Sequence, residues 1–282
     1  MRKPYPSDLT DEQWEILRPL IPPALPGGRP RKTDMREVLN TLFYQNRTGC
    51  QWDMLPHDLL PKSTVYDYFA QWRDDGTWQT ITDALRQKVR VAADRPPSPR
   101  VAYIDSQTVK ATEIAEDRGF DGGKLITGRK RHILVDSLGL LLVVLVTVAN
   151  ADDGTTAPAV LARLTAEHQS RLEVIWGDTK YHNHALEGWL VAHRAGYRIG
   201  VVGRPAGSVG YVKLPKRWVV ERTFAWRGRY RRLSRDYERY ADSSEAMVQV
   251  SSIHRMLRRL SPDPLKKPVP FKYRKLQEII PG

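Results

Sequence analysis

The sequence predicts an α/β protein in which an all-α region precedes a mixed sheet flanked by helices. Three observations support this prediction. Apolar residues recur at helical spacing through the first ninety or so residues, a proline-rich break follows, and strand-like apolar runs come after it. The expected divisions are a helical domain, a linker, a main α/β domain and a basic tail, at residues 1–94, 95–100, 101–262 and 263–282.

Four helices are expected in the first domain. Thr10 and Gln13 have the spacing of a capping box at the start of the first one. The others are expected at residues 34–47, 63–72 and 78–91, with Gly49 as the stop signal of the second. Short helices joined by tight turns favour a helix-turn-helix unit that contacts DNA. A small helical bundle that only packs against its neighbour is the alternative.

After the linker, the expected order of elements is β-β-β-α-β-α-β-α. The first strand is VAYID, which ends at Asp105, and a later strand ends at Asp178. Glu221 lies in a long helix expected at residues 217–233. Other acidic residues have structural interpretations: Asp136 is expected in a hairpin turn, and Asp152 and Asp153 in a turn that leads to a helix cap.

Asp105 and Asp178 are expected at one edge of the sheet, because ligands are handled at the carboxyl ends of parallel strands. Two neighbouring carboxylates repel unless a cation neutralises them, and oxygen ligands suit Mg²⁺ or Mn²⁺. Two such ions can assist an in-line phosphoryl displacement. Each acid also has a plainer interpretation: an aspartate after a strand often caps a turn, and Glu221 has the spacing of an ion pair with Arg217.

The charge balance favours a polyanionic partner. Lys and Arg total 45 against 32 Asp and Glu, a formal net charge of +13. An anionic membrane surface is disfavoured because no apolar run reaches the length of a membrane span. The N-terminus has no apolar signal region, and the one cysteine, Cys50, excludes an internal disulfide and cysteine-bound zinc. A cytoplasmic protein is expected.

Basic residues gather in several stretches that we interpret as a DNA path. The loop GGRPRKTD (27–34) is a candidate for minor-groove contact. A second group lies around the first strands, a third around Glu221 and a fourth at residues 255–275, although a solvated surface is the plainer account of any such run. The candidate DNA-binding residues are Arg29, Arg31, Lys32, Lys110, Lys124, Arg129, Lys130, Arg131, Arg217, Arg222, Arg227, Arg229 and Arg232.

Several stretches resemble the DDE transposases of bacterial insertion sequences, in the groups numbered four and five. They are LTDEQWEILRPLIPP (9–23), RTGCQWDMLP (47–56), IDSQTVK (104–110), GGKLITGRKRHILVDSLG (122–139), GDTKYHN (177–183) and VERTFAWRGRYRRLSRDYE (220–238). The resemblance covers roughly residues 5–260. The sequence departs from the family pattern at Leu214, where a tyrosine is usual, and at Gly228, where a lysine is usual.

The resemblance implies an RNase H-like catalytic core with Asp105, Asp178 and Glu221 as catalytic residues and metal ligands. It implies two Mg²⁺ ions, with Mn²⁺ as a substitute, and metal-dependent cleavage and strand transfer of the element's own ends. The implied partners are the terminal inverted repeats, target DNA and a second copy of the chain in a homodimer or higher oligomer, with action at the bacterial nucleoid. A retired transposase that serves as a DNA-binding regulator and a cellular nuclease of the same fold are the alternatives.

Overall fold

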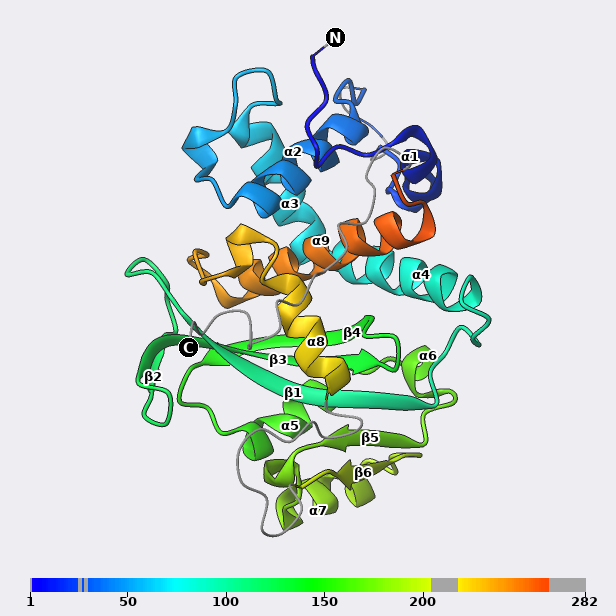
Figure 1. Ribbon diagram of the computed structural model, residues 1–282, viewed down its shortest axis with the longest axis vertical. Coiled ribbons are helices and arrows are strands. Elements are labelled where there is room, and N and C mark those ends of the chain that lie inside the picture. Colours follow the sequence, from blue (N-terminus) through cyan, green and yellow to red (C-terminus); the bar gives the residue numbers. More distant parts are fainter. Residues whose placement is uncertain (1, 25–26, 28–29, 204–217, 264–282) are drawn as a thin grey trace, which may run out of the picture.

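The computed structural model describes residues 2–24, 27, 30–203 and 218–263 (Figure 1). A helical region lies above a mixed sheet, and further helices lie below the sheet in the same view. The expectation of an α/β protein that begins with an all-α region is therefore confirmed.

The first helices follow the capping signals of the sequence. Thr10 forms the expected capping box with Gln13 at the start of α1. Asp34 caps α2, and Gly49 ends it with a φ of 75°, a conformation that glycine adopts without strain. The helical elements of this region are α1 (Asp11–Leu17), η1 (Arg18–Leu20), α2 (Met35–Thr48), η2 (Trp52–Met54), α3 (Lys62–Asp74) and α4 (Thr77–Val91).

The strands form one mixed sheet. Its members are β1 (Val101–Lys110), β2 (Gly119–Asp121), β3 (Ile126–Asp136), β4 (Leu141–Val148), β5 (Val174–Gly177) and β6 (Arg198–Val201). The neighbours run in the order β4-β3-β1-β5-β6, and β2 pairs with the start of β3. The strand β3 is antiparallel to its partners β1, β2 and β4, whereas β5 runs parallel to β1 and β6 parallel to β5.

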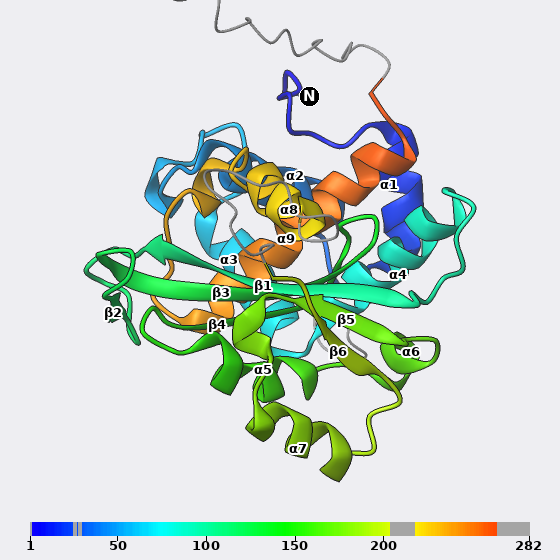
Figure 2. The same cartoon turned by 60° about the horizontal axis from the view of Figure 1, so that its bottom comes forward.

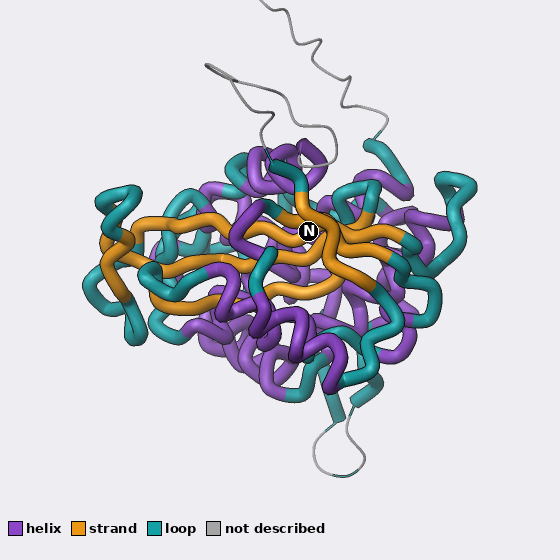
Figure 3. The backbone as a smooth tube through the Cα atoms, turned by 90° about the horizontal axis from the view of Figure 1, so that it is seen from below, coloured by secondary structure: helices purple, strands orange, loops and turns teal. Residues whose placement is uncertain are grey.

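Helices cover both faces of the sheet, and the strands form one band between them (Figures 2 and 3). One face carries α4, α8 (Trp218–Arg227) and α9 (Ala241–Leu260), and the other carries α5 (Asp153–Leu161) and α7 (His184–Ala192). The short elements α6 (Ala166–Gln169), η3 (Thr179–Tyr181) and η4 (Arg231–Leu233) complete the chain. Alternate side chains of β1 enter different hydrophobic clusters: Tyr103 belongs to the cluster that includes α9 residues, and Ala102 to the cluster that includes α5 residues.

The expected division near residue 95 separates helices from strands but does not separate two cores. The sequence patterns did not predict α9, which packs against all four N-terminal helices and against β4. Asn46 of α2 donates a hydrogen bond to the carbonyl oxygen of Met247 in α9 (3.0 Å). Arg90 of α4 forms a buried ion pair with Asp136 of β3. The helices and the sheet therefore share one hydrophobic core across the 95–100 linker.

The tail expected at 263–282 lies outside the described residues from 264 onward. In the ranges that the structure describes, no helix combines the length and the apolar character needed to cross a bilayer.

Candidate active site

Asp105 and Asp178 lie at matching positions on neighbouring parallel strands. The register of β1 and β5 pairs Val101 with Val174 and Tyr103 with Trp176. Asp105 and Asp178 each lie two residues beyond the last of these pairs. This geometry arises because the first and fourth strands of the expected order are neighbours in the sheet.

One detail of the prediction is wrong: β1 does not end at Asp105. The strand continues to Lys110, because β3 pairs with it along its whole length and Asp105 lies opposite Ile133. Asp178 does follow the last residue of β5, as expected. The site therefore lies where β5 ends beside a longer strand.

The third acid lies on a helix that covers this part of the sheet. Side chains alternate along a strand, so Asp105 faces the same side as Tyr103, which is the side that carries α8 and α9. The helix α8 contacts β1 and buries Val219 and Val220, and Glu221 is the next residue on its exposed side. Trp176 of β5 packs against the same hydrophobic cluster as Tyr103, so the same alternation assigns Asp178 to this side of the sheet as well.

Backbone amides hold both aspartates. The amide of Ser106 donates to Oδ1 of Asp105 (2.8 Å), and the amide of Lys180 donates to Oδ1 of Asp178 (3.0 Å). The bond from Lys180 makes Asp178 the N-cap of η3. The capping role that the sequence offered as the plainer interpretation of this aspartate is therefore present as well. Both side chains are half-buried.

The donor set suits a hard divalent cation, since it consists of carboxylate oxygens. Nevertheless, the described residues contain no group of three His, Cys, Asp or Glu side chains placed to hold a metal ion. Asp105, Asp178 and Glu221 therefore share one side of the sheet without forming a closed set of ligands in this conformation.

The candidate DNA-binding residues fall into different classes. The side chains of Arg31, Lys32, Lys110, Lys124 and Arg229 are exposed. Arg222 lies between the rings of Trp218 and Trp226, at 4.1 and 4.4 Å from their centroids. Arg29 and Arg217 lie outside the described residues.

Arg129, Lys130 and Arg131 were expected on a surface that contacts DNA, and this expectation is wrong. Their side chains are buried, because β3 is an inner strand of the sheet and helices cover both of its faces. Arg129 donates to the carbonyl oxygens of Glu116, Glu238 and Arg239, and Arg131 donates to those of Leu233 and Arg235. Lys130 forms an ion pair with Asp153 (3.2 Å). These cations hold the loop before α9 and the start of α5 onto the sheet.

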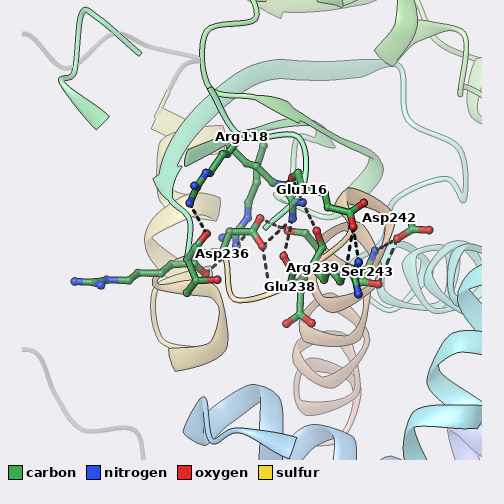
Figure 4. A network of polar contacts seen from close by, with 12 residues as sticks. Glu116, Arg118, Asp236, Glu238, Arg239, Asp242 and Ser243 are labelled. Carbon is green, nitrogen blue, oxygen red and sulfur yellow. Dashed lines mark hydrogen bonds and ion pairs between the residues drawn. The ribbon is translucent and has the colours of Figure 1, made fainter. Parts of the chain in front are cut away.

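Figure 4 shows the polar network around this loop, in which Asp236 and Glu238 lie close to Glu116 and Arg239. Asp236 is fully buried and accepts from Arg129 (3.4 Å) and from the hydroxyl of Ser244 (2.6 Å). The carboxylate partners of the buried arginines thus come from a segment about a hundred residues away in the chain.

Arg227 and Arg232 are also buried, which corrects their assignment to the DNA path. The helix α8 ends at Arg227, so the helix expected at residues 217–233 is shorter than predicted and Arg232 lies outside it. Arg232 instead forms an ion pair with the buried Glu238 (2.6 Å).

Two further acids have the structural roles expected for them. Oδ1 of Asp136 accepts from the amides of Leu138 and Leu140 in the hairpin turn (both 2.9 Å). Asp152 caps α5 through the amide of Thr155 (3.0 Å). Its neighbour Asp153 differs: its side chain is buried and bonded to β1, β3 and η3. The sequence signal that could have indicated this was a second acid directly after a capping one.

Comparisons with known proteins identify the family of this chain. Residues 96–254 match the family described as "Transposase DDE domain". The chain belongs to the DDE transposase family. The catalytic domain of this transposase is accordingly RNase H-like. The N-terminal residues 9–82 match the family described as "Putative transposase of IS4/5 family".

Two relatives of this transposase are of bacterial origin. A protein of Sinorhizobium fredii named "Uncharacterized protein y4sN" is 27% identical over 118 residues, which are 42% of this chain and 88% of the relative. The "Putative transposase for insertion sequence element IS402" of Burkholderia cepacia is 31% identical over 133 residues, 44% of this chain and 60% of the relative. DDE transposases generally use a divalent metal and act on DNA.

Proposed function

We propose that this transposase cuts DNA at the ends of its own insertion sequence and joins the freed 3′ ends to a target. Asp105, Asp178 and Glu221 are the catalytic carboxylates in this proposal. The observation that supports it is the parallel register of β1 and β5, in which the two aspartates have matching positions on neighbouring strands, together with the contact of α8 with β1.

The same three carboxylates would hold Mg²⁺, or Mn²⁺ in its place, with two ions in each active site. Bound there, the ions would activate the attacking water or 3′-hydroxyl and stabilise the leaving oxygen. The chain itself contributes position and charge: the amides of Ser106 and Lys180 orient one oxygen of each aspartate. Because Glu221 does not close the ligand set in this conformation, we expect α8 to approach the strands when metal and DNA bind.

Double-stranded DNA is the proposed partner, as terminal inverted repeats and as target. The exposed cations Arg31, Lys32, Lys110, Lys124 and Arg229 are available to phosphates, together with the net charge of +13. Arg29 and Arg217 remain candidates for the same role. We propose a homodimer or higher oligomer in the complex that holds two ends, acting at the nucleoid in the bacterial cytoplasm.

The test uses DNA that carries the inverted ends flanking the gene. Asp105→Asn, Asp178→Asn and Glu221→Gln should each retain folding and end binding but lose cleavage and strand transfer by several orders of magnitude. Because the three residues act as one unit, double variants should be little worse than single ones. Asp152→Asn is the matched control, since Asn caps a helix as well as Asp does.

An active Asp105→Asn variant of lowered stability would overturn the proposed site and return Asp105 to a turn or capping role. Sequence-specific binding without cleavage by the wild-type protein would instead indicate a DNA-binding regulator.

A further inference from the structure

Asp153 lies on the far side of the sheet from α8 and is bonded to three separate elements. It is the first residue of α5, and its side chain is only 9% exposed. Its Oδ1 accepts from the hydroxyl of Ser106 in β1 (2.7 Å) and lies 3.2 Å from Nζ of Lys130 in β3. Its Oδ2 accepts from Nζ of Lys180 in η3 (3.0 Å).

These bonds complete a continuous chain between the two proposed catalytic aspartates. Asp178 accepts from the amide of Lys180, whose ammonium group donates to Asp153. Asp153 accepts from the hydroxyl of Ser106, whose amide donates to Asp105. Four hydrogen bonds of 2.7–3.0 Å therefore link Asp178 to Asp105 through a residue on the other face of the sheet.

The local structure leaves the Asp153 side chain available for this link. Capping of α5 is done by Asp152, so Asp153 is not needed at the helix end. Burial raises the pKa of the Asp153 carboxyl, but the hydrogen bonds from Ser106 and Lys180 and the charge of Lys130 outweigh it and hold the pKa at about 2. The carboxylate is thus ionised at neutral pH and attracts both lysines.

Close packing supports the same contact. A Cβ atom at Gly154 would lie 2.4 Å from the carbonyl oxygen of Lys180, closer than atoms can approach. Glycine at this position therefore lets the start of α5 lie directly against η3. The segment after Asp178 is held by backbone packing as well as by the ion pair.

We propose that Asp153 is a positioning residue, which holds the Asp178 segment against β1 and so fixes the spacing of the two metal-binding carboxylates. This inference rests on the proposed function of Asp105 and Asp178. Residues that orient metal ligands from behind typically change metal affinity about 10- to 100-fold when they are lost.

The test measures Mn²⁺ binding to the full chain by electron paramagnetic resonance, and cleavage as a function of Mg²⁺ concentration. Asp153→Asn should weaken Mn²⁺ binding at least about tenfold and raise the Mg²⁺ concentration for half-maximal cleavage by a similar factor. Lys180→Met should have the same effect, and the double variant should add little to either one, because both break one link. Binding of DNA ends in Ca²⁺ should be unchanged.

A second pair of variants covers the case in which Asp153→Asn fails to fold. Ser106→Ala removes the hydroxyl of the link and should weaken Mn²⁺ binding, whereas Ser106→Thr keeps a hydroxyl and should restore it. Wild-type Mn²⁺ affinity in Ser106→Ala, or in a folded Asp153→Asn variant, would overturn the positioning role.

Asp105→Asn separates this inference from the proposed site. If Asp105→Asn abolishes Mn²⁺ binding while Asp153→Asn does not affect it, the positioning role fails and the site stands. Unchanged Mn²⁺ binding in Asp105→Asn would overturn the site itself.

Discussion

Replacing Arg227 with methionine is expected to raise the free energy of unfolding. Arg227 is 7% exposed, and its Nη1 forms no hydrogen bond with any residue that the structure describes. It borders a cavity of about 20 Å³ together with Arg255 and Tyr230. Burial lowers the pKa of the Arg227 guanidinium, the charges of Arg131 and Arg255 act in the same direction, and together they bring it to about 9.

The lowered pKa of Arg227 indicates how much free energy the burial of its charge costs. A fall to about 9 from an ordinary value above 12 corresponds to roughly 4–5 kcal/mol, at about 1.4 kcal/mol for each tenfold change in the protonation equilibrium. Part of this cost is recovered by contacts of the aliphatic stem. Exchange of buried charged groups for apolar ones of similar volume stabilises other proteins by about 1–4 kcal/mol, and we expect a gain in this range.

Urea denaturation of the two proteins at pH 7 measures the difference. Arg229→Met is the matched control, because Arg229 lies two residues away with an exposed side chain and should change stability by less than about 0.5 kcal/mol. A loss of more than about 1 kcal/mol in Arg227→Met would refute the reasoning, since it would mean that the buried guanidinium has a favourable partner.

The pH dependence follows from the lowered pKa. Below pH 9 the folded and unfolded chains both carry the Arg227 proton, so the cost of burying the charge is fully present. As the pH rises through 9, the folded chain releases the proton while the unfolded chain keeps it, and the cost is lost. The advantage of Arg227→Met over the wild type should therefore shrink above pH 9.

Three further outcomes are expected. Asp136→Ala should lower the free energy of unfolding by about 3–5 kcal/mol in urea denaturation, because it leaves Arg90 buried without its carboxylate; a loss below about 1 kcal/mol would contradict this. A fragment of residues 1–95 should lack cooperative thermal unfolding by circular dichroism, because it exposes the surface that packs on α9, and a stable monomeric fragment would show that the shared core is not needed. Cleavage should stop in excess EDTA and return with Mg²⁺ or Mn²⁺, whereas Ca²⁺ should support binding with little cutting; undiminished cleavage in EDTA would exclude the metal mechanism.

The sequence by itself determined the elements whose signals are local. Thr10 and Asp34 lie at the starts of α1 and α2 because capping depends on amides two or three residues away. The hairpin turn at Asp136 and the helix cap at Asp152 were also predicted, because each aspartate binds amides only a few residues away. The strand that contains Asp105 and the strand that ends just before Asp178 were also predicted, since a short apolar run indicates each of them.

The tertiary structure decided what depends on partners distant in the chain. Arg129 and Arg131 have the composition of a basic surface run, but Asp236 and the carbonyl groups that bury them lie about a hundred residues later. The length of β1 beyond Asp105 depends on pairing with β3. Asp153 resembles a second turn residue until folding brings Ser106, Lys130 and Lys180 around it. A buried charge is stable only beside such partners, and the sheet register that supplies them is a property of the whole fold.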